Sequence, residues 1–148
     1  MNSNTPILTS IKFSNATKWM LNGQVHREDG PAIEFKSGRK DWFLYGRRHR
    51  EDGPAVVYPN GEKEWWLYGE RHRLDGPAVY NKDKLEWWVN GKRHCTNGAA
   101  VERVNGDQEW WYNGVPHRFQ GPAIKYSNGY WECWINGHMI CCSEFFGK

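Results

Sequence analysis

Residues 65–78, Trp-Trp-Leu-Tyr-Gly-Glu-Arg-His-Arg-Leu-Asp-Gly-Pro-Ala, decide the fold, because variants of this stretch recur along most of the chain. The glycine that follows each aromatic run returns at intervals of 22 or 23 residues. A fixed period of this length is typical of repeat proteins, in which each unit packs against its neighbours. We therefore expect six repeats, one for each of the glycines Gly23, Gly46, Gly69, Gly91, Gly114 and Gly137.

Each repeat is predicted to be a β-hairpin followed by a loop of about seven residues. The first strand follows a Gly-Pro-Ala sequence, and the second strand is the aromatic run. Between the two strands lie residue pairs that favour positive φ angles and primed two-residue turns. These pairs are Ser37-Gly38, Asn60-Gly61, Asn105-Gly106 and Asn128-Gly129.

The fold predicted from this pattern is all-β, an elongated array of about six stacked β-hairpins that form an antiparallel ribbon. Residues 10–140 are expected to form the repeat domain, with an N-terminal arm or cap at 1–9 and a C-terminal cap or tail at 141–148. The end strands of a ribbon expose unpaired backbone groups. A homodimer through a terminal edge or through the C-terminal tail is therefore one mode of assembly that we consider.

The composition argues against several classes of protein. The 20 basic and 17 acidic residues alternate along the repeats, which argues against nucleic acid as a partner. No apolar run reaches the roughly 20 residues of a membrane-spanning helix, so we expect no membrane span and a cytoplasmic location. The four cysteines occupy unrelated positions in the repeat, which favours reduced thiols over a disulfide framework.

Side chains alternate between the two faces of a strand, so stacked aromatic runs predict columns of like residues. One face is expected to be the core. It carries Trp19, Trp42, Trp65, Trp87, Trp110 and Cys133, with Leu21, Leu44, Leu67, Val89, Tyr112 and Ile135 in the next column. The opposite face is expected to be acidic and aromatic. It carries Asp41, Glu64, Glu86, Glu109 and Glu132 beside Phe43, Trp66, Trp88, Trp111 and Trp134.

The 23-residue unit resembles the MORN repeat, because an aromatic residue precedes Asn-Gly or Tyr-Gly and a basic residue and histidine follow, as in 68–72 and 90–94. The resemblance covers residues 10–140 and implies stacked β-hairpins that serve as a scaffold for protein contacts. Where MORN repeats usually have glycine after the histidine, this chain has arginine, followed by an acid and Gly-Pro-Ala. This HREDGPA variant is similar to a subgroup associated with large DNA viruses and bacteriophages, which implies a viral protein that acts on a host factor in the host cytoplasm.

The outward aromatic residues are the leading candidates for a binding site. They either pack against one another across strands or line a groove that engages a protein partner. We predict a non-enzymatic binding or scaffold protein, with no catalytic residue, metal or cofactor, that uses this face. The predicted binding residues are Tyr45, Tyr68, Trp66, Trp88, Trp111 and Trp134.

The His-Arg-x-Asp-Gly-Pro loops have two interpretations. In the structural one, each arginine pairs with an aspartate one repeat away, which would form ladders along the ribbon. In the functional one, the protein sequesters a small anionic, nucleotide-type ligand, with Trp stacked on the base and phosphate held by His49, Arg50, His72 and Arg73. Residues 94–99 lose the arginine, aspartate and proline together, and 117–120 keep only part of the pattern.

Two further clusters are weaker candidates. The column of Glu64, Glu86, Glu109 and Glu132 contains pairs of carboxylates of the kind used in glycoside hydrolysis, but regularly spaced like charges are more often solvated or neutralised by lysines such as Lys63 and Lys84. The tail residues include thiols and an imidazole that zinc can bind, at an irregular spacing that favours buried or capping thiols instead. These residues are Cys133, His138, Cys141 and Cys142.

Overall fold

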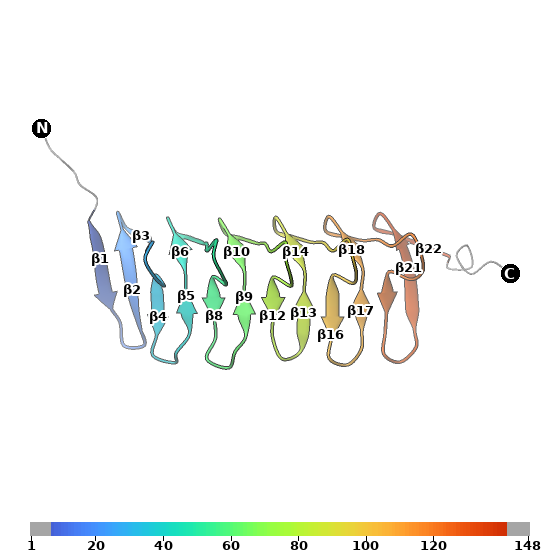
Figure 1. Cartoon of the computed structure of the whole chain (residues 1–148), viewed down its shortest axis with the longest axis horizontal. Coiled ribbons are helices and arrows are strands. Elements are labelled where there is room, and N and C mark those ends of the chain that lie inside the picture. Colours follow the sequence, from blue (N-terminus) through green and yellow to red (C-terminus); the bar gives the residue numbers. More distant parts are fainter. Residues whose placement is uncertain (1–6, 142–148) are drawn as a thin grey trace, which may run out of the picture. The chain divides into compact units, whose positions relative to one another are not determined.

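The computed structural model describes residues 7–141, and the only regular secondary structure in this range is β-strand. The strands pair as antiparallel hairpins, which confirms the predicted all-β hairpin fold. The chain divides into two compact units, Met1–Glu70 (unit 1) and Arg71–Lys148 (unit 2). Figure 1 shows the elements of both.

Unit 1 contains an antiparallel sheet in the order β1-β2-β4-β5-β8-β9, so that its hairpins follow one another along the sheet as they do along the chain (Figure 1). The short strands β6 and β7 form a separate pair, and β3 pairs with β2. The strands are β1 (Leu8–Lys12), β2 (Ala16–Leu21), β3 (Gln24–Val25), β4 (Ile33–Phe35), β5 (Lys40–Asp41), β6 (Phe43–Leu44), β7 (Arg47–Arg48), β8 (Val56–Val57), β9 (Lys63–Glu64) and β10 (Trp66–Leu67). Strand β11 (Glu70–Arg71) spans the division between the units.

Unit 2 contains the sheet order β12-β13-β16-β17-β20-β21-β22, again in chain order. Two short pairs, β14-β15 and β18-β19, lie off this sheet. The strands are β12 (Val79–Tyr80), β13 (Lys84–Glu86), β14 (Trp88–Val89), β15 (Lys92–Arg93), β16 (Val101–Arg103), β17 (Gln108–Glu109), β18 (Trp111–Tyr112), β19 (Val115–Pro116), β20 (Ile124–Lys125), β21 (Trp131–Ile135) and β22 (His138–Ile140).

The two ends of the predicted repeat domain lie close to where the structure places its outer strands. Strand β1 begins at Leu8, two residues before the predicted start at residue 10, and pairs with β2 along its whole length. At the other end, β22 ends at Ile140, and of the predicted tail only Cys141 belongs to the described residues.

The turns differ from the prediction, because a typical repeat contains two hairpins where the sequence predicted one. In the first hairpin, Gly38 N–H donates to the Phe35 carbonyl over 2.9 Å and Phe35 N–H donates to the Arg39 carbonyl over 2.9 Å. Only Gly38 has a positive φ, at 92°. This is a three-residue loop with a type I turn and a left-handed glycine. The same hydrogen bonds occur at the other three predicted pairs, so the predicted two-residue primed turns are wrong at Ser37-Gly38, Asn60-Gly61, Asn105-Gly106 and Asn128-Gly129.

The primed turns lie instead after the aromatic run. Tyr45 and Gly46 both have positive φ angles, 47° and 77°, as a type I′ turn requires. The turn reverses the chain from β6 into β7. The aromatic run itself is not one strand in the middle repeats, because it is interrupted at its first tryptophan. The interruptions lie at Trp42, Trp65, Trp87 and Trp110.

The core consists mainly of small side chains from the Gly-Pro-Ala strands, and three residues of the acidic column are buried with it, namely Asp41, Glu86 and Glu109. Asp41 is 1% exposed, and it pairs in register with Ile33 and Val56, which therefore share its face. Glu86 is likewise 1% exposed, whereas the tryptophans expected to fill the core are half-buried. The predicted assignment of the two faces is therefore wrong for the tryptophans and for these acids, although Cys133, also predicted for the core, is buried. The buried apolar residues include Ala32, Ala55, Val56, Ala78, Val79, Ala100, Val101, Ala123 and Cys133.

Candidate functional site

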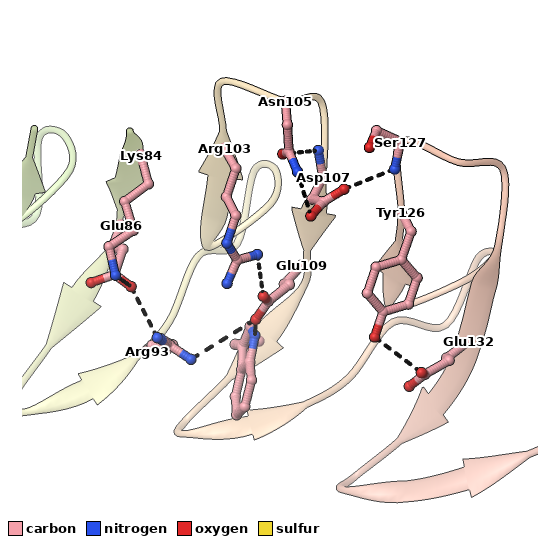
Figure 2. A network of polar contacts seen from close by, with 11 residues as sticks. Lys84, Glu86, Arg93, Arg103, Asn105, Asp107, Glu109, Tyr126, Ser127 and Glu132 are labelled. Atoms are coloured by element: carbon pink, nitrogen blue, oxygen red, sulfur yellow. Dashed lines mark hydrogen bonds and ion pairs between the residues drawn. The ribbon is translucent and has the colours of Figure 1, made fainter. Parts of the chain in front are cut away.

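The buried carboxylates of unit 2 are held in a network of hydrogen bonds and ion pairs (Figure 2). Glu86 accepts from Lys84 Nζ at 2.9 Å, from Arg93 Nη2 at 2.9 Å and from Trp88 Nε1 at 3.2 Å. Burial alone would raise the pKa of Glu86, but the hydrogen bond from Lys84 and the charge of Arg93 offset this and lower it. Glu86 is therefore an ionised carboxylate with its acceptor capacity in use, which confirms the expected neutralisation by lysine.

Glu109 repeats this arrangement one step along the sheet. It accepts from Trp111 Nε1 at 2.8 Å and from Arg103 Nη1, and Arg93 Nη1 lies 3.9 Å from its second oxygen (Figure 2). Arg93 thus bridges two carboxylates that belong to successive repeats. Paired and buried in this way, these groups stabilise the stacking of repeats, because removing either charge would leave its partner unpaired.

Unit 1 contains the equivalent network. Arg39 donates two hydrogen bonds of 2.7 Å to the carboxylate of Asp41, and Arg48 Nη2 donates a third over 3.4 Å. Glu64 accepts from the Tyr58 hydroxyl at 3.0 Å and from Trp66 Nε1 at 2.9 Å. Burial and the nearby Glu64 raise the pKa of Tyr58, so its hydroxyl stays a donor.

The four predicted binding tryptophans have part of their surface occupied by these networks. The guanidinium of Arg93 lies 5.3 Å from the Trp88 ring and 5.1 Å from the Trp111 ring, and Arg48 lies 5.5 Å from both Phe43 and Trp66. Such contacts are attractive cation–π interactions. All four indole N–H groups donate to a glutamate two residues before them, and all four side chains are half-buried. These residues are Trp66, Trp88, Trp111 and Trp134.

The binding role of these tryptophans stays a prediction, and the structure gives it a restricted form. An aromatic ring that is covered on one face and bonded through its N–H offers a partner less of its surface than a free ring does. The buried Nε atoms of Arg48 and Arg93 have no hydrogen-bond partner within residues 7–141, since they lie against these rings. Trp66, Trp88 and Trp111 therefore act first as supports for the arginines.

The arginines of the His-Arg-x-Asp-Gly-Pro loops pair within their own loop. Arg50 Nε donates to Asp52 over 2.8 Å, its Nη1 donates to the Pro54 carbonyl over 3.5 Å, and its guanidinium lies 4.3 Å from the Trp42 ring. Arg73 donates in the same way to Asp75 over 2.8 Å. The predicted ladder of arginine and aspartate from different repeats is therefore wrong. The reason is the spacing, because an aspartate two residues away lies within reach without any change in the neighbouring repeat.

Electrostatics agrees with this geometry. The hydrogen bond from Arg50 and then its charge hold the pKa of Asp52 below the usual 3.8, and Arg27 and Arg73 do the same for Asp29 and Asp75. Arg50 and Arg73, the predicted phosphate-binding residues, are each neutralised by a carboxylate of their own loop.

The histidines of these loops each hold the turn of the next repeat. Nδ1 of His49 accepts from the Tyr68 N–H at 3.2 Å, and Nδ1 of His72 accepts from the Asn90 N–H at 3.2 Å. His26 bonds the Tyr45 N–H over 3.1 Å in the same way. The four residues predicted to grip a phosphate thus have structural partners, and nucleotide binding by them stays a prediction.

Tyr45 and Tyr68 are the predicted binding residues that reach solvent. Each is 56% exposed, and each ring packs on a histidine, with centroids 4.3 Å from His26 and 4.1 Å from His49 respectively. Both adopt left-handed φ angles, 47° and 49°, which residues other than glycine and asparagine rarely adopt. Their hydroxyls make no hydrogen bond to any residue of the range 7–141.

Sequence reasoning missed one residue that has no acidic partner. Arg118 keeps the bond from Nη1 to the carbonyl of Pro122, at 3.2 Å, but position 120 is glutamine where the other loops have aspartate. The signal was visible in the sequence as a partial loop at 117–120, and it acquires meaning only once the arginine and aspartate of the other loops are seen to pair.

Cysteines and metals can be assessed only in the described part of the chain. Cys133 is buried and disulfide-bonded, so the prediction of reduced thiols is wrong for this residue. Cys142 lies outside the described residues. Within residues 7–141, no group of three or more His, Cys, Asp and Glu is placed to hold a metal ion. The same range contains no helix that is long and apolar enough to cross a membrane.

Comparison with known proteins adds no assignment. No protein-family model matches the chain, and the search of curated proteins gives no match. The resemblance to MORN repeats therefore rests on the residues of the repeat itself and stays a prediction.

Proposed function

We propose that the protein is a non-enzymatic binding protein that engages a protein partner through the exposed tyrosines of unit 1. The observation that carries this proposal is the pair Tyr45 and Tyr68, each 56% exposed at the tip of a type I′ turn. Aromatic side chains that are anchored on one side and exposed on the other are frequent energetic centres of protein interfaces.

The backbone at these two tyrosines supports the proposal. The equivalent turn position is asparagine in the other four repeats, Asn22, Asn90, Asn113 and Asn136, and all six residues have φ angles between 47° and 50°. Tyrosine in this conformation costs about 1–2 kcal/mol of backbone strain, and asparagine costs less because it tolerates the left-handed region. Strain that a simpler residue would remove points to a function for the residue that keeps it.

The histidines give the tyrosines a fixed orientation. Nδ1 of His49 bonds the Tyr68 N–H while its ring packs on the Tyr68 ring, so one imidazole fixes both backbone and side chain. A ring held in place loses little conformational entropy on binding. Trp66, two residues before Tyr68, is itself held by the guanidinium of Arg48, which lies 5.5 Å from its ring.

The test is quantitative affinity capture from cell extract with the full chain as bait. The double variant Tyr45→Asn plus Tyr68→Asn replaces both rings by the residue found at the same turn in other repeats. We expect at least a tenfold loss of every protein that the wild-type chain captures in a saturable manner. Capture that is undiminished in the double variant would refute the proposal.

A matched control separates loss of contact from loss of fold. Tyr130→Asn removes another tyrosine, 62% exposed, from a loop of unit 2, and it should leave capture unchanged. Both variants should keep the circular dichroism spectrum and the thermal midpoint of the wild-type chain to within a few degrees.

A further inference from the structure

The strongest unassigned feature is a hollow in unit 2 that lies between the loops 95–98 and 117–120. We name it the 95–136 hollow. It encloses about 820 Å³ and is also lined by Trp110, Tyr112 and Asn136. The equivalent space in unit 1 lies between the loops 27–31 and 49–52 and encloses about 560 Å³. We name it the 27–52 hollow.

The two hollows differ in charge. The 27–52 hollow is lined by two arginines and four carboxylates, Glu28, Asp29, Glu51 and Asp52. No acidic residue lines the 95–136 hollow, where Arg118 is the only arginine or lysine. Cys95 and Asn97 stand where the other loops carry arginine and aspartate, and Gln120 stands where they carry aspartate.

Arg118 keeps the other contacts that Arg27 and Arg50 share. Its guanidinium lies 3.9 Å from the Trp110 ring, its Nη1 donates to the Pro122 carbonyl, and its backbone N–H donates to the Trp134 carbonyl over 3.1 Å. Its Nε makes no hydrogen bond to any residue of the range 7–141, whereas Nε of Arg27, Arg50 and Arg73 each donates to an aspartate over 2.8 Å. The donor is positioned, and the carboxylate is missing.

There is also more room beside Arg118. A Cβ added at Gly76 would lie 2.9 Å from Cζ of Arg73, because that guanidinium packs on its own loop. At Gly121, the equivalent position, the nearest atom of Arg118 would lie 3.9 Å away, and this glycine has a φ of 101°. The loop after Arg118 thus takes a different path and leaves its guanidinium less covered.

His117 offers a second donor. Its Nδ1 accepts the Asn136 N–H at 3.0 Å, so in the neutral ring the proton is on Nε2. Nε2 of His26 lies 3.5 Å from Glu28, and Nε2 of His49 lies 3.6 Å from Glu51. Two residues after His117 stands Phe119, whose ring packs edge-on against the imidazole at 4.5 Å and is 69% exposed.

We propose that the 95–136 hollow binds an acidic polypeptide segment, and that Arg118 receives its carboxylate in the place that Asp29, Asp52 and Asp75 take in the other loops. The repeats themselves show which anion fits this arginine, since three copies hold an aspartate side chain there. Burial lowers the pKa of the Arg118 guanidinium, which means that its charge is incompletely solvated. Phe119 and Tyr112 supply an apolar wall for the residue next to the acid.

The site is separate from the tyrosine surface of unit 1, so the two proposals can fail independently. The probes are N-acetyl-Asp-Phe-amide, its Asn-Phe analogue and inorganic phosphate, titrated into the ¹⁵N-labelled full chain. The readout is the Nε–H resonance of Arg118, assigned by its loss in Arg118→Gln. We expect a saturable shift with the aspartyl peptide and at least tenfold weaker binding of the asparaginyl one.

The decisive variant is Gln120→Asp, which restores the carboxylate found in the other loops. It should fold as the wild type does and weaken binding of the aspartyl peptide at least tenfold, because the loop then fills its own site. Gln24→Asp makes the same charge change on exposed β3 of unit 1 and should leave binding unchanged.

Three results would overturn the proposal. They are equal binding of the two peptides, undiminished binding in Gln120→Asp, and tighter binding of phosphate than of the aspartyl peptide, which would assign the site to a different anion.

Discussion

The 27–52 hollow of unit 1 and the 95–136 hollow of unit 2 are built from equivalent loops, but five positions that are charged in the first hollow are uncharged in the second. In unit 1 every arginine of the loop has an aspartate two residues on. Of the two loops that line the 95–136 hollow, one has lost its arginine and the other keeps Arg118 without an acid, whereas Arg73 of unit 2 still pairs with Asp75. The comparison teaches that a repeated polar group serves the fold when its partner is repeated with it, and becomes available to a ligand where the partner is lost.

The two units also differ in the residue at the left-handed position of their type I′ turns. Unit 1 carries tyrosine at two of its left-handed turn positions, while the turns of unit 2 carry asparagine. The turns of unit 1 thus present two exposed tyrosine rings, and the loop arginines of unit 1 are paired with aspartates. The turns of unit 2 carry asparagine, and Arg118 has no aspartate in its own loop. Removal of a paired charge and removal of an exposed side chain should therefore differ in their effect on stability.

The largest effect is expected at a satisfied charge. Glu86→Ala should lower the free energy of unfolding by about 3–5 kcal/mol, because it leaves Lys84 and the partly buried Arg93 without their carboxylate. Urea unfolding followed by tryptophan fluorescence measures this loss. Glu51→Ala removes an acid whose side chain is 76% exposed and should change stability by less than about 0.5 kcal/mol. A loss below about 1 kcal/mol at Glu86 would show that the network contributes little.

A smaller effect is expected at the tyrosine turns. Tyr45→Asn should change stability by less than about 1 kcal/mol, because relief of the left-handed strain offsets the lost ring contact with His26. Tyr45→Ala keeps the strain and loses the contact, so it should cost about 0.5–1.5 kcal/mol. Thermal unfolding of the two variants side by side measures the difference. If Tyr45→Asn cost more than about 2 kcal/mol, the ring would be structural.

The smallest effect is local and depends on pH. Because the pKa of Asp52 is lowered in the folded chain, its pairing with Arg50 stabilises the loop above the unfolded pKa of about 3.8 and is lost as the pH falls through the lower folded value. The Nε–H resonance of Arg50 should therefore shift with a midpoint below pH 3.8, and that of Arg118 should show no such step. An Asp52 carboxyl midpoint at or above 3.8, measured by ¹³C NMR, would contradict the pairing.

The repeat was readable from the sequence because its period is fixed by glycines at positions of positive φ. Gly46 and Gly69, among the glycines that set the repeat count, have φ angles of 77° and 90°, a conformation that side chains resist. Such backbone requirements are local, so they leave a mark at every copy. The choice of turn type was not local in this sense, and the type I loop at 35–39 was missed because Ser-Gly and Asn-Gly fit both turn types.

Burial of the acidic column could not be predicted from alternation alone. Asp41 and Glu86 lie on the same face as valine and isoleucine. Patterning from a single sequence assigns such acids to the solvent side, because a lone buried carboxylate is costly. Hydrogen bonds and ion pairs from arginines such as Arg48 and Arg93 offset the desolvation of these carboxylates. The arginines lie seven residues after the acids in the sequence, on the other side of the type I′ turn. That proximity exists only after the aromatic run breaks and folds back.

The sequence by itself determined that the chain repeats, that its repeats are β-hairpins and where each glycine turn lies, because these follow from backbone conformation within a few residues. The tertiary structure decided which charged groups pair with one another within the fold. The sequence shows that Gln120 stands after Arg118 where Asp52 stands after Arg50, but only the structure shows that Asp52 lies 2.8 Å from its arginine and is its partner. Distances of that kind are set by folding, since a hydrogen bond depends on where side chains meet in space.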